Sequence, residues 1–330
     1  MDDRKPVISV LMPVFNAAPF LREAIESILH QTFSGFEFII INDGSTDSSK
    51  EIILSFQDPR IRYIENETNL KLIATLNKGI NLCSGKYIAR MDADDISLPD
   101  RLKLQVEFME SNPEIALCGT GFQIMGRSDQ ISGFAANNDE IRIRMLHQVQ
   151  LLHPSVLLRR ESLLQKNIMF DPDYIHAEDY DFFVRIAENY KVANIPGVLV
   201  KYRVHDANIS NIHGEIQNEN TKKVIIRQFR KLKDDFTAYD CELYLKFAYS
   251  EFPWFDKQKV EYLDKLLTLL QSENERKLYL PVIQLKEYWS DKLFHICYNV
   301  PECMDIWRHS VFYEKGKMTL LKSIKKYIKR

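Results

Sequence analysis

The sequence lacks the features by which a chain enters or crosses a membrane. Residues 1–6 contain no apolar segment of the kind that forms the core of a signal peptide. No run approaches the ~18 apolar residues that a membrane span needs. The five cysteines include no Cys-x-x-Cys pair, and their odd number gives no disulfide framework. These absences predict a cytoplasmic protein.

A large excess of charge of one sign is also missing. The 330 residues carry a formal net charge of −2, which argues against a nucleic-acid partner bound by bulk positive charge. With 45% hydrophobic and 27% charged residues, the composition is that of a folded protein with one large or two smaller domains. The sequence shows no internal repeat and no low-complexity tract.

Two glycine-based phosphate sites are absent as well. No Gly-x-Gly-x-x-Gly follows the first expected strand, and no Walker-type lysine loop occurs. The segment Gly119-Thr120-Gly121 lacks the third glycine and is expected to form a turn. A nucleotide site in this chain would therefore depend on acidic side chains and a metal ion.

In the first third of the chain, apolar strand-like runs alternate with amphipathic helical patterns. The expected strands are residues 8–15, 36–41, 60–65 and 87–91, with helices beginning near residues 19, 48 and 72. Such alternation is typical of βαβ units, so the fold class is α/β with a mainly parallel, Rossmann-like sheet flanked by helices. In these sheets, ligands bind at the carboxyl ends of the strands.

The pattern changes after about residue 211, where strand signals end and long helical patterns begin. We therefore expect an α/β domain of residues 1–215 and a helical accessory region of residues 216–330. The region ends in a basic amphipathic helix, residues 320–330. This helix is either simply solvated or docks on an anionic membrane surface.

The rest of the chain is organised around the stretch from Tyr87 to Pro99. An apolar strand runs into Asp92, Asp94 and Asp95, and a helix start follows, with Ser97 able to cap it. Three carboxylates this close repel one another unless positive charge lies among them. A divalent cation bridging to a phosphate meets that need, because hard cations bind carboxylate and phosphate oxygens. A polar loop with a capping aspartate is the alternative.

Several short segments, in this order and spacing, resemble the family 2 glycosyltransferases of the GT-A fold. The segments are residues 10–16, 42–47, 77–79, 87–95, 177–180 and 202–205. The later segments are most similar to bacterial transferases that extend lipopolysaccharide or lipooligosaccharide, β-1,3-N-acetylglucosaminyltransferases in particular.

The resemblance implies an inverting, metal-dependent hexosyl- or N-acetylhexosaminyltransferase of bacterial surface polysaccharide synthesis. The donor would be a UDP-sugar (UDP-GlcNAc, UDP-Gal, UDP-Glc or UDP-GalNAc), and the acceptor a hydroxyl of a glycan. A lipid-linked glycan would place the protein at the inner face of the bacterial inner membrane. The oligomeric state is left open.

The resemblance also implies roles for individual residues. Asp179 would be the general base, with Glu178 next in line, and Asp94 would bind Mn²⁺ or Mg²⁺. The nucleotide-sugar-binding residues would be Pro13, Phe15 and Asp43 around the uracil, Asp92 on the ribose or sugar, and Arg90, Asn16 and Ala93 beside the donor. Leu70 stands where many relatives have a glycine, which puts the approach of this loop to the donor in question.

Three histidines have open roles. His205 either reaches the metal or only makes a hydrogen bond. His153, before Pro154, lines the acceptor side or orders a turn, and His176 could help to orient the nearby acid pair.

Two other functions remain open. A non-catalytic nucleotide-sugar-binding or scaffolding homologue would not need to keep Asp43, Asp92, Asp94 and Asp179 together. A nucleotidyltransferase would also use a sheet and Mg²⁺, but usually with a glycine- and lysine-rich loop that residues 13–18 do not offer.

Overall fold

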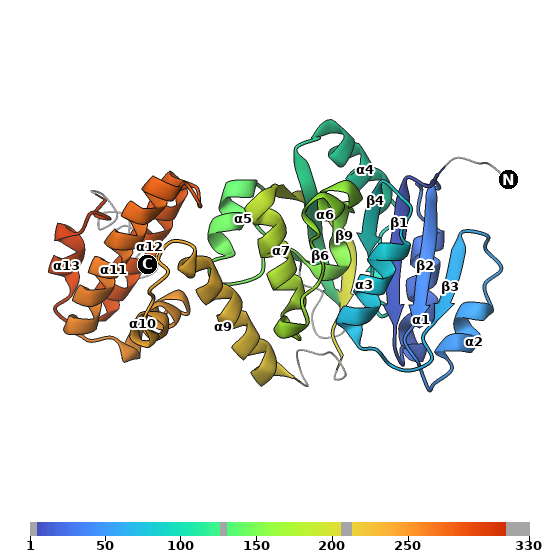
Figure 1. The fold of residues 1–330 in the computed structure, drawn as a ribbon, viewed down its shortest axis with the longest axis horizontal. Coiled ribbons are helices and arrows are strands. Elements are labelled where there is room, and N and C mark those ends of the chain that lie inside the picture. The colour runs from blue at the N-terminus through green and yellow to red at the C-terminus, as the bar shows by residue number, and fades with distance from the viewer. Residues whose placement is uncertain (1–4, 126–130, 206–212, 315–330) are drawn as a thin grey trace, which may run out of the picture. The chain divides into compact units, whose positions relative to one another are not determined.

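The computed structural model describes residues 5–125, 131–205 and 213–314 of the chain. The chain divides into two compact units, residues 1–224 and 225–330 (Figure 1), which are described separately. The division falls inside helix α9 (Gly214–Arg230), whereas the sequence places the domain boundary at 215/216. The basic helix expected at residues 320–330 lies outside the described residues.

The first unit is built on a nine-stranded mixed sheet of order β3-β2-β1-β4-β8-β6-β9-β5, with β7 paired to β6. The strands are β1 (Ile8–Val14), β2 (Phe36–Asn42), β3 (Ile61–Glu65), β4 (Tyr87–Arg90), β5 (Ile96–Ser97), β6 (Ile115–Met125), β7 (Ile131–Ser132), β8 (Leu157–Arg159) and β9 (Lys191–Arg203). Strands β1 to β4 pair in parallel, β8 is antiparallel to β4 and β6, and β9 is parallel to β6. The expected α/β class is confirmed.

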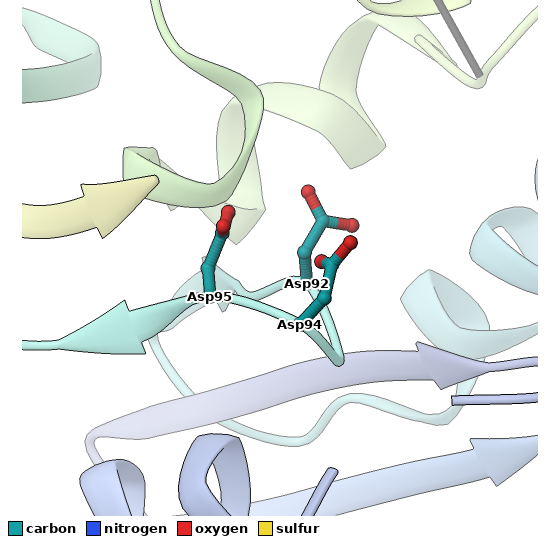
Figure 2. A group of neighbouring side chains, drawn as sticks. All are labelled: Asp92, Asp94 and Asp95. Carbon is teal, nitrogen blue, oxygen red and sulfur yellow. The ribbon is translucent and has the colours of Figure 1, made fainter. Parts of the chain in front are cut away.

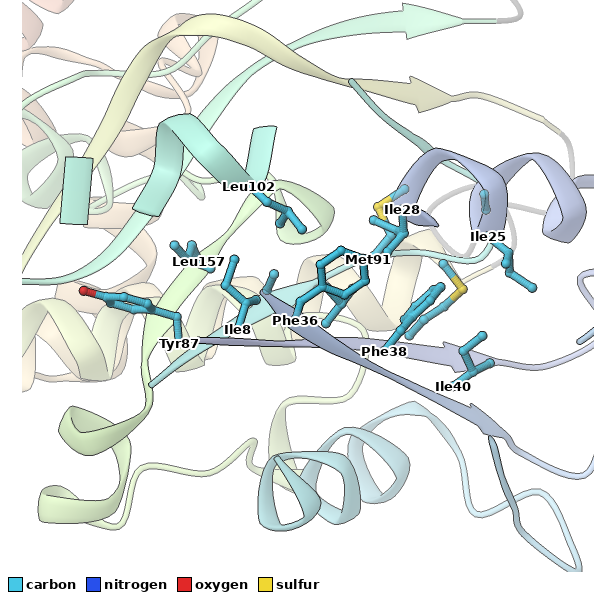
Figure 3. Close-up of a cluster of buried hydrophobic side chains, with 14 of the residues drawn as sticks. Ile8, Ile25, Ile28, Phe36, Phe38, Ile40, Tyr87, Met91, Leu102 and Leu157 are labelled. Atoms are coloured by element: carbon cyan, nitrogen blue, oxygen red, sulfur yellow. The ribbon is translucent and has the colours of Figure 1, made fainter. Parts of the chain in front are cut away.

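Helices cover both faces of the parallel strands. Among the described residues before α9, the helices are α1 (Ala18–Leu29), α2 (Ser49–Leu54), α3 (Leu72–Leu82), α4 (Arg101–Ser111), α5 (Asn138–Arg144), α6 (Arg160–Lys166) and α7 (Glu178–Asn189). Side chains alternate along a strand, so Ile8 and Val10 belong to one buried cluster. Figure 3 shows Ile8 in this cluster with Ile28 of α1 and Leu102 of α4. Leu11 points the other way, against Gly79 of α3. Burial on both faces explains the continuous apolar runs.

Two local expectations are wrong. The turn expected at Gly119-Thr120-Gly121 lies inside β6. A Cβ on Gly119 would lie 2.3 Å from Oδ1 of Asn194 in β9, so this glycine serves the close packing of neighbouring strands rather than a turn. Ser97 does not cap a helix, because it pairs with Val200 in the sheet and the helix begins at Arg101.

The second unit is helical in its described residues. After the end of α9 it contains α10 (Ala238–Ala248), α11 (Lys257–Lys277), α12 (Val282–Asn299) and α13 (Met304–His309). Thr237 and Asp240 form a reciprocal capping box at the start of α10, and Asp256 caps α11. Across the described parts of both units, no helix is long and apolar enough to cross a membrane.

Candidate active site

The carboxyl ends of β1, β2 and β4 meet at one edge of the sheet, because these three strands are parallel neighbours. Pro13 lies in β1 opposite Ile41 of β2, and Ala93 is buried in the loop after β4. The structure thus brings the predicted donor residues of three separate segments to the same edge. It also shows which of these side chains make hydrogen bonds to other groups of the protein.

Asn16 ties the loops after β1 and β2 together. Its backbone N–H donates to Ser45 Oγ (3.0 Å), and its side-chain oxygen accepts from the Thr46 backbone N–H (2.8 Å). Its φ of 51° is in the left-handed region, which asparagine tolerates better than most residues. Its amide oxygen therefore shapes the loop, whereas the neighbouring Phe15 ring is 48% exposed and can stack on a planar base.

Asp43, at the end of β2, is buried and held in one orientation. Its Oδ1 accepts from Asn66 Nδ2 (2.7 Å) and from the Leu70 backbone N–H (2.9 Å). Lys78 in turn donates to Asn66 Oδ1 (2.5 Å). Leu70 therefore still brings its backbone to Asp43 at the position where many relatives have glycine. Asn66 and Lys78 thus help to hold the Asp43 carboxylate in place, a role that was not predicted from the sequence.

The acid cluster follows β4 directly. Figure 2 shows Asp92, Asp94 and Asp95 projecting from the same side of one loop, with one ligand oxygen of each within 4.8 Å of the others. Burial, together with the Asp92 carboxylate, raises the pKa of Asp94 and raises that of Asp95 well above its ordinary value. Asp95 Oδ2 is buried without a hydrogen-bond partner. This set of oxygen atoms fits a hard divalent cation such as Mn²⁺ or Mg²⁺.

The end of β9 packs against this cluster. His205 Nε2 lies 3.0 Å from Asp94 Oδ2, and its ring stacks on Phe20 with 4.8 Å between ring centroids. Arg203 donates from its backbone N–H to Asp95 Oδ1 (2.7 Å) and from Nε to the Asp94 carbonyl (2.8 Å). Asp95 was predicted from the sequence as a member of the acid cluster, whereas Arg203 was given no role of its own, although it belongs to the segment 202–205 that carries the family resemblance.

A pair of carboxyls at the start of α7, Glu178 and Asp179, interacts electrostatically with residues at the acid cluster. Arg90, the last residue of β4, is buried and forms an ion pair with Asp92. Burial raises the pKa of Asp179 to about 6; Asp92 adds to this shift and Arg90 opposes it. Burial and the Asp179 carboxylate raise the pKa of Glu178 to about 7. Carboxyls with pKa values in this range suit proton transfer near neutral pH.

His153 and His176 are the other two histidines whose roles the sequence left open. His153 begins the 3-10 turn His153–Ser155 and is buried, so it orders a turn rather than forming an exposed acceptor surface. The His176 ring stacks on His213, with 4.4 Å between centroids. The His176 backbone hydrogen bond opposes the rise in the pKa of Glu178, which gives His176 an effect on the acid pair through its backbone.

Sequence comparison finds relatives along most of the first unit. The family described as Glycosyl transferase family 2 matches residues 9–166. An uncharacterized glycosyltransferase of Haemophilus influenzae is 34% identical over 232 residues, which cover 66% of this chain and 72% of that protein. A protein of Escherichia coli named UDP-Glc:alpha-D-GlcNAc-diphosphoundecaprenol beta-1,3-glucosyltransferase WfgD is 28% identical over 213 residues, 64% of this chain and 81% of its own.

Solved structures share the fold. S. aureus TarS 1–349 in complex with UDP-GlcNAc superposes with a TM-score of 0.59 at 18% identity, covering 91% of this chain and 83% of that one. The mannosyltransferase PcManGT from Pyrobaculum calidifontis, in complex with GDP-Man and Mn²⁺, gives 0.53 at 16% identity, covering 90% and 86%. These similarities confirm the expected GT-A-like fold. The finer resemblance to N-acetylglucosaminyltransferases stays a prediction, since the functionally named relative WfgD is a glucosyltransferase by name.

Proposed function

This chain belongs to glycosyltransferase family 2, and we propose that it is an inverting, metal-dependent enzyme that moves a sugar from a UDP-sugar to a glycan hydroxyl. One observation carries this proposal. A metal-suited acid cluster and a carboxyl pair of raised pKa, Glu178 and Asp179, both interact electrostatically with the buried guanidinium of Arg90. A purely non-catalytic homologue would not need to keep both groups.

The donor site is proposed at the ends of β1 and β2. The exposed Phe15 ring would stack on the uracil beside Pro13, and the fixed carboxylate of Asp43 would accept from the uracil imide N–H. Arg90, Asp92 and Ala93 would lie along the ribose, diphosphate or sugar. The names of TarS bound to UDP-GlcNAc and of the UDP-Glc enzyme WfgD support a UDP-sugar, with UDP-Gal and UDP-GalNAc as further candidates.

Asp94 would hold Mn²⁺ or Mg²⁺, with Asp92 and Asp95 beside it and His205 completing or orienting the ligand set. The Mn²⁺ of PcManGT, a protein of the same fold, supports a metal at such a site. When bound, the cation acts as a Lewis acid that stabilises negative charge on the departing diphosphate.

Asp179 would take the proton of the acceptor hydroxyl as that oxygen attacks the anomeric carbon. The bond from the anomeric carbon to the β-phosphate oxygen breaks in the same displacement, and UDP leaves with the electron pair. Because a direct displacement inverts the anomeric carbon, an α-linked UDP-sugar gives a β-glycoside. Glu178, with a pKa of about 7, can carry a proton and so limit the negative charge beside Asp179.

The acceptor is proposed to be a lipid-linked glycan of bacterial surface polysaccharide, met at the inner face of the inner membrane. The lipid diphosphate in the name of WfgD supports this class of acceptor. The lysine-rich sequence of residues 320–330 supports attraction to an anionic membrane surface.

The test is thermal unfolding of the purified protein with UDP, GDP, CMP and their sugars, first with Mn²⁺ and then with EDTA. A ligand at ~100 times its dissociation constant should add about 2.7 kcal/mol of stability. We expect a metal-dependent shift with uridine compounds alone, followed by transfer assays that release UDP. Binding without any transfer would favour the non-catalytic homologue, and pyrophosphate release would identify a nucleotidyltransferase.

A further inference from the structure

The first turn of α1 is held in place by a residue of the loop after β2. The Asp47 carboxylate accepts from the Ala18 backbone N–H through Oδ2 (3.0 Å) and from the Ser49 backbone N–H through Oδ1 (3.0 Å). Asp47, from the segment 42–47 that carries the family resemblance, thus joins the first residues of α1 and α2. Backbone N–H groups in a first turn have no partner within the helix. Phe20, two residues after Ala18, therefore projects from a fixed turn.

The Phe20 ring contacts two side chains from the end of β9. This half-buried ring stacks on the His205 imidazole, with 4.8 Å between centroids and 28° between the planes. The guanidinium carbon of Arg203 lies 4.8 Å from the centroid of the same ring. The strand pattern continues past the end of β9, because the Val204 backbone N–H donates to the Met125 carbonyl (2.9 Å). Arg203 and His205 are two residues apart and so project from the same face.

Both side chains also reach the acid cluster. His205 Nε2 lies 3.0 Å from Asp94 Oδ2, and Arg203 Nε donates to the Asp94 carbonyl (2.8 Å). The two nitrogens of an imidazole are in its edge, whereas the stack on Phe20 uses its face. One ring can therefore stack and bind through Nε2 at the same time, and it cannot turn far from Asp94 without losing the stack.

Glu23 gives Arg203 a second contact with α1. Glu23 lies three residues after Phe20, which places the two side chains on the same face of the helix. Its Oε2 accepts from Arg203 at 2.5 Å. Arg203 is therefore held to α1 by two residues, so loss of the Phe20 ring should act mainly through His205.

We propose that Phe20 is a positioning residue for the metal site, and that its ring keeps His205 Nε2 within reach of a cation held by Asp94. A side chain that is already ordered loses less conformational entropy when it binds, which strengthens binding. The part of the proposal that concerns the cation rests on the proposed function, whereas the placement of His205 on the ring does not.

The first test uses the metal-free protein and is independent of catalysis. The ring current of Phe20 should shift the His205 ring-proton resonances, which are assigned by their loss in His205→Gln. In Phe20→Leu these resonances should move toward the values of a free imidazole, and in Phe20→Tyr they should stay in place. Unchanged His205 resonances in Phe20→Leu would overturn the proposal, even in a protein without transferase activity.

The second test measures Mn²⁺ binding by electron paramagnetic resonance in the presence of UDP. Because residues that orient a ligand tune metal affinity, we expect the Kd of Mn²⁺ to rise about tenfold in Phe20→Leu. Phe20→Tyr should restore the wild-type value. The double variant of Phe20→Leu with His205→Gln should bind about as weakly as His205→Gln alone, since the ring then has no imidazole to hold. Fully additive losses would overturn the proposal.

A wild-type protein that binds no Mn²⁺ would overturn the proposed function and the cation part of this proposal, whereas the resonance test judges the ring contact by itself.

Phe56 provides the matched control. Its ring is also half-buried and lies 5.1 Å from the guanidinium carbon of Arg22, which donates to Ser55 Oγ (3.1 Å). Phe56→Leu should lower the melting temperature, as Phe20→Leu does, and leave the Kd of Mn²⁺ unchanged. An equal loss of Mn²⁺ affinity in both Leu variants, in step with their melting temperatures, would show a role in packing alone and overturn the proposal.

Discussion

The two units of the chain bury charged groups in different ways. The first unit buries several, on strands, helices and loops; they are Asp43, Arg90, Asp95, Arg101, Glu178 and Asp181. In the described part of the second unit, Asp240 is the only buried residue among the Asp, Glu, Lys and Arg side chains. Its carboxylate accepts from the Thr237 backbone N–H (2.9 Å) and from the Tyr262 hydroxyl (2.8 Å).

The comparison separates charged groups that the protein itself pairs from charged groups that are buried but left for a ligand to pair. Removing charge from water is costly unless hydrogen bonds and opposite charges replace the hydration. Asp240 has such partners, and its hydrogen bonds lower its pKa despite the opposing effect of burial. In Asp95 and Glu178, burial and then the neighbouring carboxylates raise the pKa. We expect a bound metal ion, sugar donor or acceptor to pair with buried carboxyls whose pKa is raised in this way.

The largest effect is expected from Asp179→Asn. Loss of a positioned base should lower kcat by ~10²–10⁴-fold. Binding of the UDP-sugar, measured by calorimetry, should be retained, and the melting temperature should not fall because a neutral amide removes repulsion.

Asp181→Asn is the matched control on the same helix, since Asp181 pairs with Arg185 at 2.6 Å. It should lower stability while folded molecules keep their turnover. If Asp179→Asn kept wild-type activity, Glu178 rather than Asp179 would be the general base.

The pH dependence of stability should differ between the units. The folded pKa of Glu178 lies above its unfolded value, so its contribution to stability falls as pH rises from about 4.5 to about 7. At about 1.4 kcal/mol per pKa unit, this loss is about 3 kcal/mol. Glu178→Gln should remove it, as measured by urea unfolding and by hydrogen exchange of α7 in EDTA.

Asp240 has the opposite sign, because its folded pKa is lowered and its stabilisation is lost on acidification below its unfolded value. Protection of the α10 backbone amides against hydrogen exchange should therefore decrease at low pH. If the unfolding free energy of Glu178→Gln depended on pH as strongly as that of the wild type, burial would not be what keeps the Glu178 carboxyl protonated.

Gly119→Ala tests close packing far from any charge. The new Cβ would lie 2.3 Å from Asn194 Oδ1, and the Asn194 side chain cannot easily move because it donates to Ala135 O (2.7 Å) and Gln150 O (2.9 Å). Overpacking of this kind typically costs about 1–3 kcal/mol. Gly133→Ala is the control, since no atom of the described residues would lie within 4 Å of the added Cβ. Equal urea midpoints for the two variants would contradict the packing argument.

The smallest effect is expected from Thr237→Ala, which removes the capping box of α10. It should cost about 1 kcal/mol, whereas Thr237→Ser should keep most of the cap. The three tryptophans, Trp254, Trp289 and Trp307, all lie in the second unit, so their fluorescence follows its unfolding. Turnover per folded molecule should be unchanged. A larger loss of kcat would show that the second unit takes part in catalysis.

Much of the first unit can be predicted because its signals are local. The helix at residues 72–82 and the parallel strands follow from the period of their apolar residues, and Asp92 and Asp94 follow a buried strand in sequence. The helical character after residue 211 is equally visible. Gly119 and Ser97 were misread because their constraints come from β9, which is distant in sequence.

The sequence by itself determined the fold class, the family and the acidic residues, because these depend on short-range patterns and on side-chain chemistry. Only the tertiary structure decided that Asn66 holds Asp43 and that Arg203 and His205 reach the acid cluster. Those contacts join residues far apart in the chain. Their distances, burial and pKa shifts arise only when packing brings the segments together in a medium of low polarity.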